Sequence, residues 1–208
     1  MTPLRFYMAR TLRNEPAMAA LSVSQASLLA PLQGRTVALV GNARALADGA
    51  QGTAIDAADV VVRINRAPMP DAASHGTRTD WLGLATSLPA DDRARLAPGR
   101  ILWMSPKRKR LDWETAHSPG FYLHPLADYE RLAETLGAPP TTGAMLIDLA
   151  LRSDLSALSL YGFDFFASQS LSGRRSADQV PHDFGAERNW VQGLAAADPR
   201  LHLHLPPA

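Results

Sequence analysis

Amide side chains directly follow two short apolar runs of this sequence, at positions where polar groups can bind a ligand. Gly41 and Asn42 come after the run from Thr36 to Val40, and Asn65 comes after the run from Val60 to Ile64. Gly41 permits a tight turn against a ligand, and an amide both donates and accepts hydrogen bonds. If the runs are neighbouring parallel strands, both asparagines lie at one edge of a sheet and can bind one ligand. An ordinary strand-to-helix turn is the alternative.

A second set of ligand-binding groups lies at Thr141, Thr142 and Gly143, which follow two prolines and precede a stretch of helical composition. Hydroxyls and free backbone N–H groups at a helix N-terminus bind phosphates and carboxylates, helped by the partial positive charge of the helix dipole. A threonine cap after a Pro-Pro turn, without any ligand, is the alternative interpretation.

His182 is the candidate general base. A neutral imidazole accepts a proton near neutral pH, as the deprotonation of an attacking hydroxyl group requires. Glu187 stands five positions later, in a stretch with helical spacing, and we expect it to hold the loop and the helix start rather than transfer a proton. A surface histidine followed by a helix-forming glutamate is the alternative.

No metal site is predicted. Asp56 and Asp59 precede the second apolar run, where carboxylates commonly cap or pin a turn. His202 and His204 alternate on a predicted terminal strand and share a face, but no third ligand can be named for a metal ion.

Short apolar runs that alternate with helical stretches predict a doubly wound α/β fold. The early runs are uniformly apolar, as in a mainly parallel sheet that is buried on both faces. We therefore expect a helical segment over residues 1–33 and a single Rossmann-like domain over residues 34–208, with a mainly parallel sheet of about seven strands. The predicted strands are Thr36–Val40, Val60–Ile64, Trp81–Leu84, Ile101–Met104, Phe121–Leu123, Leu158–Tyr161 and Leu201–Leu205, and the predicted helices of the domain are Ala127–Leu136, Thr142–Arg152 and Ala186–Ala197.

The N-terminal segment carries an amphipathic pattern. Leu4, Met8 and Leu12 recur at four-residue spacing among arginines, which predicts a helix packed on the domain or a helix bound to a membrane surface or a partner. The densest charge run, from Lys107 to Arg110, is either a solvated face or a site for anionic lipid headgroups or a phosphorylated glycolipid. The sequence leaves both alternatives open.

Composition excludes several functions. The chain has no cysteine, so disulfides, zinc-thiolate sites and thiol nucleophiles are excluded and a reducing compartment fits. A net charge of +1 gives no general attraction to nucleic acid. No apolar stretch approaches the roughly 18 residues of a membrane-spanning helix, and no signal peptide is recognisable. A cytoplasmic protein is expected, with peripheral contact at the inner membrane as an open alternative.

Three blocks of the sequence, in a fixed order, resemble the large, small and very small sialyl motifs of glycosyltransferase family 29. They run from Val37 to Thr79, from Pro140 to Phe163, and from His182 to Glu187. Members of this family transfer sialic acid from its CMP ester. The resemblance implies a GT-A-like variant of the Rossmann fold and an inverting, metal-independent transferase that needs no cofactor. The implied donor is CMP-sialic acid, and the implied acceptor is a glycan or glycolipid.

The resemblance also implies the roles of the site residues. Asn42 and Asn65 would bind the phosphate and ribose of CMP, and the segment from Thr141 to Gly143 would contact the nucleotide and the sugar carboxylate. His182 would be the general base, with Glu187 completing the third block.

The sequence departs from the family at two places. Animal members link the large and small motifs by a disulfide, whereas Val37 stands at that place here, so we infer a bacterial-type version. The family's third motif, whose histidine assists the leaving phosphate, is not recognisable between Phe163 and His182, where Arg174, Arg175 or nearby serines are the alternatives. A transferase for another CMP-activated acidic sugar, such as Kdo, and a CMP-sugar-binding module without catalysis are the rival functions.

Overall fold

The computed structural model describes residues 1–164 and 181–204. Within them, seven strands form one sheet in the order β5-β4-β3-β2-β1-β6-β7, and all neighbouring strands run parallel. The predicted α/β fold with a parallel sheet is confirmed. The strands are β1 (Thr36–Val40), β2 (Val60–Ile64), β3 (Trp81–Leu84), β4 (Arg100–Trp103), β5 (Tyr122–Leu123), β6 (Ala157–Tyr161) and β7 (Leu201–His204).

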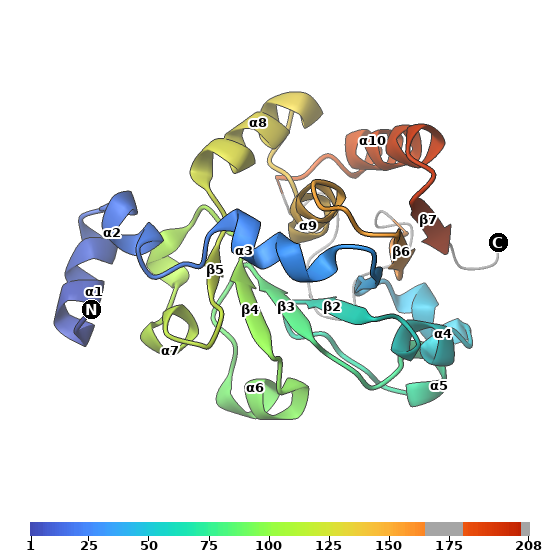
Figure 1. Cartoon of the computed structure of the whole chain (residues 1–208), viewed down its shortest axis with the longest axis horizontal. Helices are drawn as coiled ribbons and strands as arrows, with labels where there is room; N and C mark the ends of the chain where they lie inside the picture. Colours follow the sequence, from blue (N-terminus) through green and yellow to red (C-terminus); the bar gives the residue numbers. More distant parts are fainter. Residues whose placement is uncertain (165–180, 205–208) are drawn as a thin grey trace.

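Helices cover both faces of this sheet. The α-helices are α1 (Pro3–Thr11), α2 (Glu15–Ala19), α3 (Gln25–Leu29), α4 (Gly52–Asp56), α5 (Ala72–His75), α6 (Ala90–Leu96), α7 (Trp113–Ala116), α8 (Leu126–Leu136), α9 (Thr142–Leu151) and α10 (Phe184–Ala197), and the 3-10 helices are η1 (Ala30–Leu32), η2 (Arg44–Asp48) and η3 (Arg108–Arg110). Figure 1 shows α8, α9 and α10 on one side of the sheet and α4, α5 and α6 on the other.

The central strand β1 is buried on both faces. Val37 and Leu39 pack into a core with residues of α3, α8, α9 and α10. Ala38 and Val40 face the other way, into a core with residues of η2 and α4. A further core joins β3, β4 and β5 to α1, α2, α6 and α7. The uniformly apolar run in the sequence therefore reflects a strand with no solvent-exposed face.

The predicted elements agree with the observed ones to within two residues at each described end. Leu205, the predicted end of the last strand, lies outside the described residues. The N-terminal segment forms three short α-helices, because the side chains of Thr2, Asn14 and Ser24 each accept a hydrogen bond from a backbone N–H at a new helix start.

The direction of strand addition reverses between β1 and β6. From β1 the chain adds β2, β3, β4 and β5 on one side, and then returns to add β6 and β7 on the other. In parallel α/β sheets such a reversal opens a crevice at the carboxyl ends of the two strands, where ligands bind. A ligand site is therefore expected at the carboxyl ends of β1 and β6.

Helix lengths bear on membrane insertion. Among the helices in residues 1–164 and 181–204, none is long and apolar enough to cross a bilayer.

Candidate functional site

The carboxyl ends of β1 and β6 approach each other so closely that glycine is required on both strands. Gly41 N donates a hydrogen bond to Tyr161 O at 2.7 Å. A Cβ atom on Gly41 would lie 2.4 Å from Gly162 O. Gly162 itself has φ +66°, a conformation that side chains disfavour. The predicted tight turn at Gly41 is therefore set by contact with the neighbouring strand.

Phe163 connects the end of β1 with the start of α9. Its Cδ2 atom lies 3.2 Å from the place of a Cβ on Gly41, and its Cε1 atom lies 2.7 Å from the place of a Cβ on Gly143. The ring thus fills the space that both glycines leave open. The sequence places Phe163 at the end of the second block but does not predict these contacts, because an aromatic residue after a strand gives no sign of which turns it will contact.

Asn42 and Asn65 lie at the carboxyl ends of β1 and β2, as predicted, and their amides link neighbouring strands. Asn42 Nδ2 donates to Ile64 O at 3.0 Å, and Asn65 Oδ1 accepts from Ala85 N at 2.9 Å. Asn65 has φ +54°, which asparagine tolerates better than most residues. Each asparagine therefore helps to shape the edge of the sheet at which it would meet a ligand.

The helix α9 begins at the same edge with a threonine cap. Thr141 Oγ1 accepts a hydrogen bond from Ala144 N at 3.1 Å, while Thr142 and Gly143 are buried in the first turn. The threonine cap is therefore present, and it leaves anion binding open, because a capped N-terminus still has first N–H groups without acceptors inside the helix.

His182 lies just before α10 and is anchored to the segment that precedes α9. Its Nδ1 atom is 2.7 Å from Pro139 O. A carbonyl oxygen only accepts hydrogen bonds, so Nδ1 must carry the proton of this contact. In the neutral ring the lone pair then lies on Nε2, the atom that can take up a proton.

Glu187 lies in the first turn of α10 and binds Thr141. Its carboxylate accepts a hydrogen bond from Thr141 N at 2.6 Å and another from the Thr141 hydroxyl at 2.8 Å. The side chain is buried, and this burial raises the pKa of Glu187 to about 7, against the opposing effect of the two hydrogen bonds from Thr141. The expected role in holding the helix start has a structural basis in this contact.

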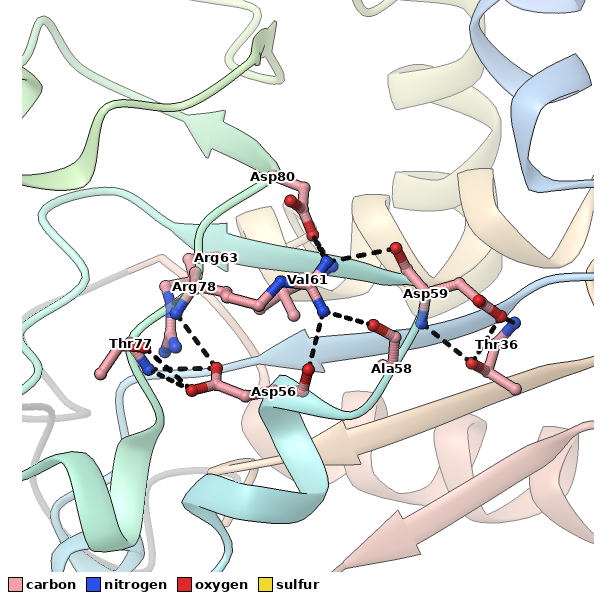
Figure 2. A network of polar contacts seen from close by, with 9 residues as sticks. All are labelled: Thr36, Asp56, Ala58, Asp59, Val61, Arg63, Thr77, Arg78 and Asp80. Atoms are coloured by element: carbon pink, nitrogen blue, oxygen red, sulfur yellow. Dashed lines mark hydrogen bonds and ion pairs between the residues drawn. The ribbon is translucent and has the colours of Figure 1, made fainter.

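Asp56 and Asp59 belong to a polar network at the opposite edge of the sheet, before β2 (Figure 2). Asp56 accepts hydrogen bonds from the backbone and hydroxyl of Thr77 and from Arg78 N. Asp59 accepts two hydrogen bonds from Thr36. Both carboxylates therefore pin turns and strand starts, as the sequence analysis favoured over metal binding.

Arg63 of β2 passes through this network while almost wholly buried, with 1% of its surface exposed. Its guanidinium donates to Arg78 O at 2.7 Å and to His75 O at 2.8 Å, and burial lowers its pKa to about 10. Figure 2 shows Arg63 and Arg78 side by side next to Asp56. These contacts give Arg63 a structural role, in fixing the loop before β3.

His202 and His204 both lie on β7, but His204 stacks on Tyr161 with ring centroids 4.3 Å apart. Within the described residues, no group of three or more histidine, aspartate or glutamate side chains is placed to hold a metal ion.

The structure connects the three sequence blocks through specific contacts. Phe163 links the first block to the second, and the contact of Glu187 with Thr141 links the third block to the second. His182 contacts Pro139, the residue just before the second block. Arg174 and Arg175, named as alternatives for binding the leaving phosphate, lie outside the described residues.

Solved structures of two sialyltransferases share this fold. A mammalian sialyltransferase in complex with Gal-beta-1-3GalNAc-ortho-nitrophenol has 19% sequence identity and a TM-score of 0.61, covering 84% of this chain and 70% of its own. The sialyltransferase CstII from Campylobacter jejuni, in complex with cytidine-5'-monophosphate, has 14% identity and a TM-score of 0.57, covering 85% of this chain and 82% of its own. Similar structures thus come from a mammal and a bacterium, and the inferred bacterial type is not confirmed.

Sequence comparison gives the family directly. No curated protein matches this chain, but the profile of glycosyltransferase family 29 (sialyltransferase) matches residues 5–113. The matched segment includes Gly41, Asn42 and Asn65 and spans more than half of the 208 residues. With its seven-stranded parallel sheet, the chain belongs to glycosyltransferase family 29, the sialyltransferase family.

Proposed function

We propose that this protein transfers sialic acid from CMP-sialic acid to a hydroxyl group of a glycan, with inversion and without a metal ion. The observation that carries the mechanism is the contact between His182 Nδ1 and Pro139 O. It assigns the lone pair of the neutral ring to Nε2, as a general base requires.

The proposed reaction is a single displacement. His182 Nε2 takes the proton of the acceptor hydroxyl while its oxygen forms a bond to the anomeric carbon of the sugar. The bond between that carbon and the phosphate oxygen breaks on the opposite side, and CMP leaves with the bonding electrons. Glu187 acts as a positioning residue, because its carboxylate is occupied by Thr141.

The nucleotide is proposed to bind between the ends of β1 and β2 and the start of α9. Gly41 keeps the end of β1 packed against the end of β6, and Asn42 and Asn65 lie at the ends of β1 and β2. The capped N-terminus of α9, with Thr142 and Gly143 in its first turn, suits the phosphate or the sugar carboxylate.

Metal independence is supported because two candidate carboxylates already accept hydrogen bonds from the protein itself. Asp56 and Asp59 were the acidic residues considered as metal ligands, and the hydrogen bonds of both hold protein turns. Localisation to the cytoplasm, with contact at the inner membrane as an alternative, stays a prediction.

The direct test is CMP release from a panel of CMP-sugars, with and without glycan acceptors, in the presence of a metal chelator. Release that requires both CMP-sialic acid and an acceptor supports the proposal. Release from CMP-Kdo alone would assign a different acidic sugar. Tight CMP binding without turnover on any donor would indicate a binding module, and loss of transfer on chelation would contradict the metal-independent mechanism.

A further inference from the structure

The large hydrophobic side chains that are exposed in the described part of the chain all lie within its first twelve residues. Leu4 is 72% exposed, Met8 is 54% exposed and Leu12 is 73% exposed, and Met1 and Tyr7 accompany them. Elsewhere in the described residues, side chains of this size are at least partly buried. Such a concentration of exposed apolar surface marks an interaction site.

Helix geometry places the exposed side chains on one stripe. Leu4, Met8 and Leu12 are four residues apart, so they lie above one another along α1 and its C-cap. The opposite face holds the helix in place, because Phe6 and Ala9 are buried and Phe6 packs edge-on against Trp113 of α7 at 5.6 Å. The stripe is therefore presented outward by a helix that already has its own packing partner.

Basic side chains lie around the apolar stripe. Arg5 and Arg13 are exposed on and just after α1. Arg10 Nη1 donates to Leu111 O at 2.8 Å, which joins α1 to the end of η3. The exposed basic side chains that η3 and its N-cap add are Lys107, Lys109 and Arg110.

Arg108, the remaining member of the basic run, has turned inward. It is buried, forms an ion pair with Glu15, and donates hydrogen bonds to Ser105 O and His124 O. This contact fixes η3 in position relative to the N-terminal helices. The other three charges of the run are consequently left on the surface beside α1.

We propose that α1 and η3 form a docking surface for an anionic lipid bilayer. Apolar side chains flanked by cations match the boundary between acyl chains and negatively charged headgroups. A second copy of the chain fits this surface less well, because a symmetric contact would bring the same cations against each other. The surface is small and carries one apolar stripe, so the expected binding is reversible and sensitive to salt.

The position of α1 agrees with this role. Figure 1 shows α1 at one end of the molecule, beside α2 and far from β7 along the long axis. In the sheet, β5 lies at this end, and β4, β3 and β2 lie between it and β1. Docking through α1 therefore leaves the crevice between β1 and β6 uncovered.

Vesicle flotation tests the proposal without depending on any enzymatic activity. The full chain is mixed with vesicles of phosphatidylcholine and phosphatidylglycerol in equal amounts, or of phosphatidylcholine alone. We expect flotation with the anionic vesicles at low salt and its loss at high salt. The variant Leu4→Gln/Met8→Gln/Leu12→Gln should float at least roughly tenfold less, while its melting temperature stays close to that of the wild type because all three side chains are exposed.

Charge variants test whether η3, the second element of the docking surface, contributes to binding. Lys109→Gln should weaken binding roughly fivefold, as expected for one cation near an anionic surface, whereas Arg35→Gln, an exposed cation before β1, should leave it unchanged. Absence of flotation with anionic vesicles would overturn the proposal, as would equal flotation with both lipids or an unchanged glutamine triple variant. A dimer that the triple variant dissociates, without vesicle binding, would assign the stripe to a second copy of the chain instead.

Discussion

Glu187 of α10 holds Thr141 at the start of α9 through two hydrogen bonds, one from the backbone N–H at 2.6 Å and one from the hydroxyl at 2.8 Å. The two residues are 46 positions apart in the chain. Thr141 also caps α9 through Ala144 N, so one carboxylate ties the helix start proposed to bind the donor to the first turn of α10, which follows His182.

The burial of Glu187 makes stability depend on pH in a defined direction. The pKa of Glu187 is raised from 4.5 to about 7 by burial, so the folded state holds the proton more tightly than the unfolded state. The stability that this pKa difference contributes is fully present below pH 4.5 and is lost as pH rises to about 7. The free energy of unfolding changes by roughly 3 kcal/mol over this range. In Glu187→Gln, which keeps the shape and one acceptor, chemical unfolding should lose this slope. An unchanged slope would show that Glu187 does not titrate in this range.

Gly41→Ala should disrupt the crevice itself. The added Cβ would lie 2.4 Å from Gly162 O, and backbone must move to relieve the clash, at a cost of roughly 2–4 kcal/mol. CMP should then no longer raise the melting temperature. Gly49→Ala is the matched control, since the nearest atom to its added Cβ is 3.6 Å away. Equal stability and CMP response of the two variants would contradict the close approach of β1 and β6.

Asn65→Asp separates the structural role of this residue from its proposed role in binding. The carboxylate keeps the acceptor for Ala85 N and the tolerance for positive φ, so the melting temperature without ligand should stay near the wild-type value. CMP binding should weaken by at least about tenfold, because a negative charge replaces an amide near the phosphate. Calorimetric titration measures the affinity for CMP, and an unchanged affinity would show that Asn65 is not part of the nucleotide site.

His124 follows β5 and makes the fold sensitive to acid. Both ring nitrogens are buried and have no hydrogen-bond partner among the described residues, and burial lowers the pKa of His124 from 6.5 to about 4. The stability present above pH 6.5 is therefore lost as pH falls toward 4, by roughly 3 kcal/mol. His124→Phe should remove this loss and leave stability at neutral pH similar or higher. An identical acid transition in the variant and the wild type would count against a buried neutral histidine.

The strands and the main helices were predictable because their signals are local. Val37 to Val40 are apolar without interruption, and the α9 start combines prolines, threonines and a glycine. The positions of Asn42 and Asn65 followed from the rule that parallel strands share a carboxyl edge.

The contacts that fix the site were not predictable, because they join residues far apart in the chain. Pro139 orients His182 through a backbone carbonyl, which is present at every position and gives no sequence signal. Phe163 fills space left by two glycines from different elements. The inward turn of Arg108 likewise depends on Glu15, 93 positions away.

His182→Ala tests the central claim most directly. The substitution removes the proposed base and none of the proposed nucleotide contacts, so CMP affinity should stay near the wild-type value. Acceptor-dependent CMP release from CMP-sialic acid should fall by roughly 10² to 10⁴. His202→Ala, on the exposed side of β7, is the matched control and should retain the wild-type rate. A His182→Ala enzyme that transfers sialic acid at the wild-type rate would contradict the mechanism.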